Sequence, residues 1–165
     1  MPMIRRLLAA AAAITALAAS AGAAAPKAAI FPFDLVDVSL SGQYAGPDAH
    51  EAERLRLVTE ELRTLAKRDG NYEVLDLSSI APEIAKAVPI LKCRCEADLA
   101  RRVGANVAIT GFVRTVSNLV LEMHLVETDV ASGKVTKSHR VEMRGNTDET
   151  WLRGVRRLLA NHVAG

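Results

Sequence analysis

The sequence predicts an α/β fold of the α+β kind, in which a mixed sheet of about five strands is flanked by helices. Apolar residues recur at helical spacing in two segments, residues 52–66 and about 148–162, which predicts two long helices. Between them, strand-like segments separated by turn residues predict a three-strand antiparallel meander. Half of the residues are apolar but only 4% are aromatic, so we expect a core of Leu, Val, Ile and Ala.

The first twenty-odd residues have the layout of a secretory signal peptide. Arg5 and Arg6 precede an apolar run too short to span a bilayer, and small residues with A-x-A cleavage options follow. We expect a signal peptide at residues 1–23, with cleavage near 21–25, and a periplasmic mature chain with no transmembrane segment. Residues 26–165 have the usual size of a single α/β domain.

Removal of the leader makes the mature chain formally neutral. The whole chain has 21 Lys and Arg against 19 Asp and Glu, and the leader contains two arginines and no acidic residue. A neutral chain lacks the broad positive field that drives nucleic-acid binding. We therefore expect no nucleic-acid partner.

The amino-terminal half predicts a strand, a helix and a second strand. An apolar run at residues 28–33, followed by Asp34-Leu35-Val36-Asp37-Val38, predicts one buried strand whose end carries two aspartates. Asp48, with a glutamate three residues later, predicts the start of a helix by a capping box. Asp69-Gly70-Asn71 ends this helix, and residues 72–77 predict the second strand.

The carboxyl-terminal half predicts short helices, the meander and a last helix. Pro82 suits the first turn of one short helix, and residues 96–103 have helical spacing that ends at Gly104. Strands follow at residues 106–115, 119–128 and 134–144. A last helix, from about Asp148 to His162, buries Trp151, Leu152, Val155, Leu158 and Leu159.

The turn residues of the last hairpin predict its register. A three-residue loop at 131–133, with Gly133 in the left-handed conformation, pairs Val130 with Lys134. Pairing back from this turn gives an apolar and a polar face, with Leu121 opposite Met143, Met123 opposite Val141 and Leu125 opposite His139. A two-residue loop would mix the faces. The preferred register also separates His124 from His139, the most tempting metal pair.

Cys93 and Cys95 are candidates for a disulfide or for metal binding. In an oxidising compartment two cysteines usually form a disulfide, but a C-x-C bridge closes a very small ring and is more easily reduced. Three interpretations stay open: a bridge, free or inter-chain thiols, and a soft-metal or thiol-exchange site. Two cysteines cannot complete a four-ligand zinc site, and no C-x-x-H or H-x-x-x-H pattern lies nearby.

Two polar segments are candidates for contact with a ligand or partner. Asp34 and Asp37 could serve acid–base chemistry or bind a divalent cation, whereas capping of the following loop explains them without a site. Asn146, Asp148 and Trp151 lie in a polar stretch that helix capping largely explains. The sequence contains no G-x-S-x-G, P-loop, G-x-G-x-x-G or H-E-x-x-H motif, so we expect neither an enzyme nor a cofactor.

Several segments resemble a family of exported proteobacterial proteins of unknown function, namely residues 28–34, 104–111, 129–134 and 144–151. More distantly, the I-F-P-F strand and the later G-A-x-x-x-x-x-G strand are similar to the amino-terminal domain of TolB and to CsgG-like envelope lipoproteins. This similarity implies a mixed sheet flanked by helices, in proteins that assemble envelope complexes rather than catalyse reactions. The closer family tends to have C-x-x-C where this chain has C-x-C, and it brings no catalytic residues.

Together these observations favour a non-catalytic accessory or binding protein of the cell envelope, with an envelope protein as its partner. The alternative is a thiol-based redox or metal-handling protein that uses Cys93 and Cys95. A third interpretation is an enzyme that uses Asp34 and Asp37.

Overall fold

The computed structural model describes residues 24–37, 49–117 and 119–165 of the chain. Its strands are β1 (Lys27–Ile30), β2 (Asp34–Asp37), β3 (Glu73–Val74), β4 (Val107–Ser117), β5 (Val120–Asp129) and β6 (Val135–Arg144). Its helices are α2 (Ala49–Arg68), α3 (Ala81–Ala87), α4 (Ile90–Cys93), α5 (Glu96–Arg102) and α6 (Asp148–Ala164), with a 3₁₀ turn, η1 (Ser78–Ile80), before α3. The expected signal peptide and the expected cap at Asp48 lie outside the described residues.

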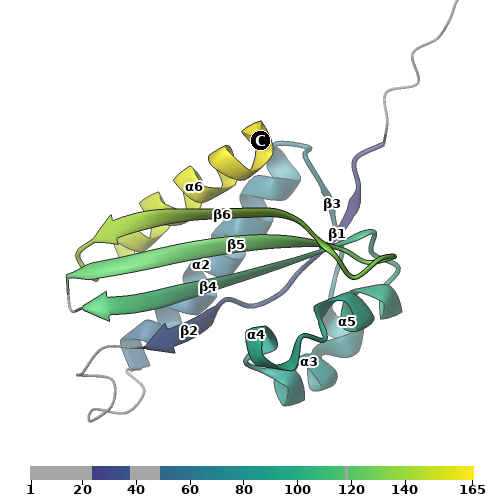
Figure 1. Ribbon diagram of the computed structural model, residues 1–165, viewed down its shortest axis with the longest axis horizontal. Coiled ribbons are helices and arrows are strands. Elements are labelled where there is room, and N and C mark those ends of the chain that lie inside the picture. Colours follow the sequence, from purple (N-terminus) through teal and green to yellow (C-terminus); the bar gives the residue numbers. More distant parts are fainter. Residues whose placement is uncertain (1–23, 38–48, 118) are drawn as a thin grey trace, which may run out of the picture.

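The strands form one mixed sheet in the order β3-β1-β4-β5-β6, and β2 pairs with β4 beyond the end of β1 (Figure 1). β1 is parallel to both of its neighbours, β3 and β4, and β2 is parallel to β4. β4, β5 and β6 form the expected antiparallel meander. The α+β class is therefore confirmed, with six strands in the described residues where about five were expected.

The expected amino-terminal strand is in fact two strands, because the register changes around Pro32. Ile30 pairs with Ile109, whereas Asp34 pairs with Phe112, so this segment has one more residue between the two pairs than β4 has. Proline has no N–H to donate to a sheet ladder. The two aspartates therefore begin and end a separate strand, β2, instead of following a single long one.

The residue after this proline joins the sheet to α2. The backbone N–H of Phe33 donates to the Thr59 hydroxyl of α2 over 3.0 Å. Its ring lies over Gly111 of β4, where any added Cβ would overlap the ring. Gly111 is thus required by close packing.

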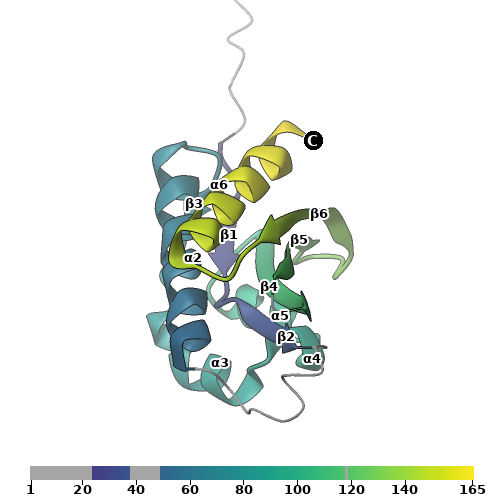
Figure 2. The same cartoon turned by 90° about the vertical axis from the view of Figure 1, so that its left-hand side faces the viewer.

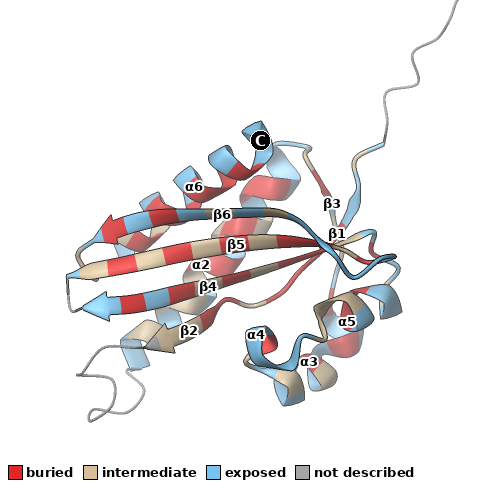
Figure 3. Cartoon of the chain, in the orientation of Figure 1, coloured by how far each residue is buried: buried red, intermediate tan, exposed pale blue. Residues whose placement is uncertain are grey.

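The two faces of the sheet are covered differently (Figure 2). α2 and α6 lie along one face, over β4, β5 and β6, whereas α3, α4 and α5 lie on the other face, near β1 and β4. Each face has its own core, with Leu62 and Trp151 in the cluster under α2 and α6, and Phe31 and Ile90 in the cluster under the short helices. Buried and more exposed residues alternate along β4 and β5 (Figure 3). Among the described residues, no helix is long and apolar enough to cross a membrane.

The predicted strand at residues 72–77 is shorter than expected. Only Glu73 and Val74 pair with β1. The chain then turns away, because the Asp76 carboxylate accepts hydrogen bonds from both the backbone N–H (2.9 Å) and the hydroxyl (2.7 Å) of Ser78. η1 begins at this turn.

The register of the last hairpin is confirmed along the strands and wrong at the turn. Leu121 faces Met143, and the other two expected pairs on this face are also present. The turn closes one residue earlier than expected, because the N–H of Asp129 donates to the Lys134 carbonyl over 2.9 Å. A bulge at Thr136 absorbs the difference, and Gly133 has the expected positive φ of 67°.

Candidate functional site

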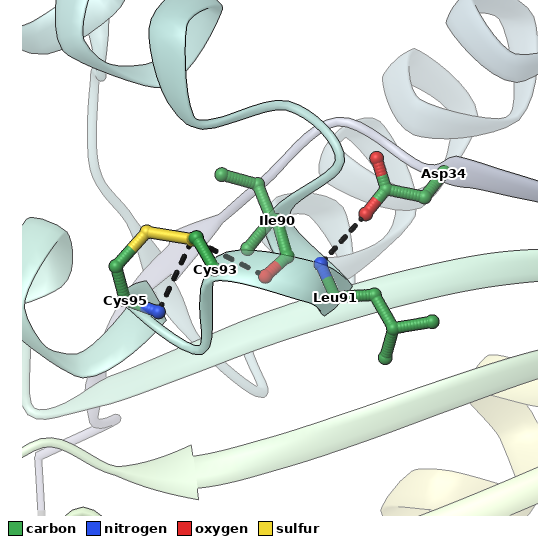
Figure 4. Close-up of a disulfide and its surroundings, with 5 residues drawn as sticks. All are labelled: Asp34, Ile90, Leu91, Cys93 and Cys95. Carbon is green, nitrogen blue, oxygen red and sulfur yellow. Dashed lines mark hydrogen bonds between the residues drawn. A yellow bond between two sulfur atoms is a disulfide. The ribbon is translucent and has the colours of Figure 1, made fainter.

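Cys93 and Cys95 lie at the end of α4, where their sulfur atoms are bonded to each other (Figure 4). The two Cα atoms are 5.2 Å apart. Arg94 between them ends α4 in the left-handed conformation, with a φ of 52°. Cys93 is exposed and Cys95 is half-buried, so solvent reaches the pair. The bond closes α4 into a compact turn on the surface.

Asp34 holds the same turn from the sheet. Its carboxylate is buried and accepts a hydrogen bond from the backbone N–H of Leu91 over 2.9 Å (Figure 4). Burial raises the pKa of Asp34, and hydrogen bonds from the Leu91 and Ile90 backbone oppose that rise. Asp34 therefore caps α4, which supports the capping interpretation of this residue. Asp37 pairs through its backbone with Thr115 at the other end of β2, and its side chain lies outside the described part of the structure.

Two large apolar side chains are exposed at this turn. Ile90 is fully buried, but Leu91 is 40% exposed and Val88, just before α4, is 50% exposed. Leu91 is held by its backbone bond to Asp34 and by the Cys93–Cys95 bond at the end of α4, and the Val88 N–H donates to the Ile84 carbonyl. An apolar group on a rigid surface turn loses little conformational freedom when a partner covers it.

The sheet beside α4 presents a polar face that we call the open face, made of Phe112, Arg114, Glu122, His124 and Arg140. The register places these side chains on the side of the sheet opposite α2 and α6. The rings of Phe112 and His124 stack with centroids 4.3 Å apart. Glu122 lies between two guanidinium groups, 3.8 Å from Arg114 and 3.5 Å from Arg140. These charges are partly exposed and suit the polar rim of a protein interface.

The polar stretch before α6 connects α6 to α2. The Asn146 carbonyl accepts hydrogen bonds from the Trp151 indole (2.9 Å) and from Arg54 (3.1 Å). Arg54 also pairs with Asp148 over 2.8 Å. Thr147 caps α6 in a capping box with Thr150. Asn146, Asp148 and the buried Trp151 are therefore occupied by contacts within the chain.

The sequence analysis did not predict a buried polar cluster of Tyr72, Glu127 and His162, between the sheet and the end of α6, with the exposed Thr136 at its edge. Glu127 accepts from the Tyr72 hydroxyl (2.5 Å) and from the Thr136 hydroxyl (2.7 Å), and lies 3.3 Å from His162 Nε2. The signal was present in the sequence, because Glu127 continues the alternation of Leu121, Met123 and Leu125, and His162 continues the buried stripe of the last helix.

Burial and these hydrogen bonds set the charge states of the cluster. Burial lowers the pKa of His162, and the hydrogen bond to Glu127 opposes this effect. Burial raises the pKa of Glu127, but the hydrogen bonds from Tyr72, Thr136 and His162 outweigh it, so the pKa is lowered. His162 Nδ1 is buried without a partner, so a proton there would have no acceptor. A neutral His162 that donates from Nε2 to an ionised Glu127 agrees with the lowered pKa of both groups and leaves no proton on Nδ1.

The structure brings some predicted residues together and separates others. It joins Asp34 to the cysteine turn, a link that spans 57 residues of sequence. It places His124 on the open face, opposite Arg140, and His139 on the other face, where its ring packs against His162. In residues 24–37, 49–117 and 119–165, no group of three or more His, Cys, Asp and Glu side chains is arranged to hold a metal ion.

Residues 26–163 match the protein family DUF3280, described as a protein of unknown function (DUF2380). No curated protein matches the chain. The family of unknown function expected from the sequence is thus confirmed, while its proteobacterial origin and the distant likeness to TolB and CsgG stay predictions.

Three solved structures are similar to the chain in fold. The LpoB C-terminal domain from Salmonella enterica has a TM-score of 0.52 at 18% identity, over 76% of this chain and 87% of that one. The PelC dodecamer from Paraburkholderia phytofirmans has a TM-score of 0.54 at 16% identity, over 85% and 89%. Lipoprotein GNA1162 from Neisseria meningitidis has a TM-score of 0.51 at 14% identity, over 85% and 97%. At these identities the likeness shows the fold alone.

Proposed function

We propose that this chain, which belongs to the DUF3280 family over residues 26–163, is a non-catalytic accessory protein of the cell envelope that acts by binding a protein partner. It would be exported by a signal peptide at residues 1–23 and work in the periplasm as one domain of residues 26–165. The basic and apolar layout of the leader supports export. The similarity in fold to lipoprotein GNA1162 supports an envelope location.

The observation that carries this proposal is the turn of α4. Leu91 and Val88 are exposed there, although the turn is fixed by a disulfide and by the buried Asp34. The open face continues this surface with partly exposed charges that suit the edge of an interface. The proposed partner surface is therefore α4 with the open face.

Assembly on this fold has a precedent among the similar structures. PelC forms a dodecamer. A second copy of this chain is accordingly one partner that the experiment must distinguish from another envelope protein.

Site-specific photo-crosslinking in the native host tests the proposal. A photoreactive phenylalanine replaces Leu91, and in a matched strain it replaces Val163, which is equally exposed, at 39% against 40%, but lies on α6. We expect one discrete crosslinked product from position 91 in the periplasmic fraction, identified by mass spectrometry, and none from position 163. With the photoreactive residue at position 88 instead, the same partner should be crosslinked. Leu91→Asp in that chain should abolish the product from position 88.

The outcomes separate the alternatives. A product that contains two copies of this chain would make the partner a second copy, and a different envelope protein would support the accessory role. Equal products at positions 91 and 163, or a product that persists in the Leu91→Asp chain, would contradict the proposed surface. A chain recovered with residues 1–23 still attached would contradict export.

A second candidate function, thiol redox or metal handling, is favoured by the exposure of Cys93. An attacking thiol needs access to one sulfur of the bond, and Cys93 provides it. Intact mass of the native and the denatured protein, purified without reductant, tests this role. A bound metal, or reduced thiols in the periplasm, would favour it over the accessory function, and an intact disulfide without metal would not.

A further inference from the structure

A cavity lies where two neighbouring parallel strands send the chain to opposite faces of the sheet. β1 and β3 are parallel neighbours. After β1 the chain leads through β2 to α2 on one face, and after β3 it leads through η1 to α3 on the other face. Such a divergence leaves a crevice outside the carboxyl ends of the strands, which is where open α/β sheets bind ligands.

The cavity has the size and the walls of a small-molecule site. Its volume is about 610 Å³, within the range of roughly 300–1,000 Å³ typical of ligand pockets. Pro32 follows β1, Leu75 follows β3, and Ile84, Ala85 and Val88 of the α3 segment form the opposite wall. These walls are apolar, so they suit the hydrocarbon part of a ligand.

The charged side chains that line the cavity carry more negative than positive charge. Two carboxylates, Glu60 and Asp76, line it against one guanidinium, that of Arg63. Arg63 is already occupied, because Nε (3.1 Å) and Nη2 (2.7 Å) donate to the Ile30 carbonyl and Nη1 (2.8 Å) donates to Glu60. The hydrogen bonds from Ser78 lower the pKa of Asp76, so this carboxylate is ionised. The lining groups therefore carry one net negative charge, because Arg63, the cation among them, acts on Asp76 electrostatically but donates its hydrogen bonds to Ile30 and Glu60.

We propose that this cavity binds a small organic cation with an apolar body, of the alkylammonium class, with the ammonium group at Asp76 and the hydrocarbon against α3. Arg63 holds the end of β1 and neutralises Glu60, and Ser78 orients the Asp76 carboxylate. The site is on the α3 side of the sheet and shares Val88 with the edge of the proposed partner surface, but its charged group, Asp76, lies outside that surface.

Titration of the isotope-labelled full chain by NMR tests the site with two probes of equal chain length, octylammonium and octanoate. We expect saturable shifts of the Ser78, Ala81 and Ala85 amides, and roughly fivefold tighter binding of octylammonium, the size expected for one partly exposed charge pair. Asp76→Asn should remove this preference and leave octanoate binding unchanged. Ala85→Phe should fill the cavity and prevent binding of both probes.

Asp98→Asn is the matched control, because Asp98 is an exposed carboxylate on α5 that does not line the cavity. This variant should retain the preference for octylammonium. Equal affinity for the two probes, a preference that survives Asp76→Asn, shifts confined to other parts of the chain, or no saturation at millimolar probe would each overturn the proposal. A chain that crosslinks no partner at α4 but binds octylammonium would contradict the proposed function and leave this site intact.

Discussion

The two faces of the sheet differ in how deeply their polar groups are buried and how closely these groups are paired. Under α2 and α6, Glu127 and His162 are buried, and His162 Nε2 lies within hydrogen-bond distance of the Glu127 carboxylate. On the open face, Glu122 and Arg140 are in partial contact with solvent and only loosely paired. Both glutamates lie on β5, five residues apart, with their side chains on opposite faces of the sheet.

This difference predicts that substitutions of the buried polar groups under α2 and α6 cost more stability than substitutions on the open face. Buried hydrogen-bonded groups cost much free energy when one partner is lost, whereas exposed ion pairs contribute little. The short-helix face instead presents Leu91 on a turn and a cavity beside α3. Substitutions on the two faces should therefore have very different effects.

The largest effect is expected for Trp151→Ala. The indole is fully buried under α6 and donates to Asn146, so its loss should lower the free energy of unfolding by about 3–5 kcal/mol. Leu91→Ala, on the exposed turn, should change it by less than about 0.5 kcal/mol. Urea denaturation followed by circular dichroism measures both. Equal losses in the two variants would contradict this difference between the faces.

Alanine substitutions of the two glutamates on β5 should differ in their effect on stability. Glu127→Ala leaves the Tyr72 hydroxyl and His162 without their acceptor, which should cost about 1–3 kcal/mol for a buried unsatisfied group. Glu122→Ala removes only partly exposed ion pairs and should cost less than about 1 kcal/mol. The urea midpoints of the two variants, compared at equal slope, measure the two losses. A larger loss of stability for Glu122→Ala than for Glu127→Ala would contradict this prediction.

The double variant Cys93→Ser/Cys95→Ser should have a moderate effect. A crosslink that closes so short a loop removes little unfolded-state entropy, so we expect a loss of about 1–2 kcal/mol. Hydrogen exchange should show faster exchange of the Leu91 amide and little change in α6. The matched variant Asp34→Asn keeps the disulfide and weakens the cap at Leu91. Faster exchange in α6 in either variant would contradict a separate role for α4.

The smallest effect is a pH dependence specific to the buried cluster. The pKa of His162 in the folded chain is lowered from 6.5, so the unfolded chain takes up a proton first as the pH falls. The stability from the neutral imidazole is fully present above pH 6.5 and is lost below it. Urea midpoints of the wild type should therefore fall more steeply below that pH than those of His162→Gln. Parallel profiles would argue against a neutral buried His162.

Local sequence signals predicted the elements whose contacts are local. Thr147 and the acids after it mark the start of α6, and Gly133 marks the turn of the last hairpin, because caps and turns depend on neighbouring residues. The split of the first strand was also readable, since Pro32 lies inside the run. The turn closure was missed because the Thr136 bulge depends on its contact with the buried Glu127.

The candidate site was less predictable because it depends on distant contacts. α4 is only four residues long, and its cap comes from Asp34 in another strand. No local pattern predicts such a helix, since a single turn is too short to show a period. The cavity next to α3 likewise follows from the strand order, which places β3 beside β1. Asp76 and Arg63 become neighbours only through that order.

The parallel pairing of β1 and β2 with β4 has a consequence for synthesis of the chain. β4 begins at Val107, so the first two strands lack this central partner until most of the polypeptide has been made. Pairing between such distant segments is slow, because a long loop must close first. The meander and α6, by contrast, are contiguous in sequence and can form without delay. A growing chain of this topology therefore cannot complete its sheet until β4 has been made.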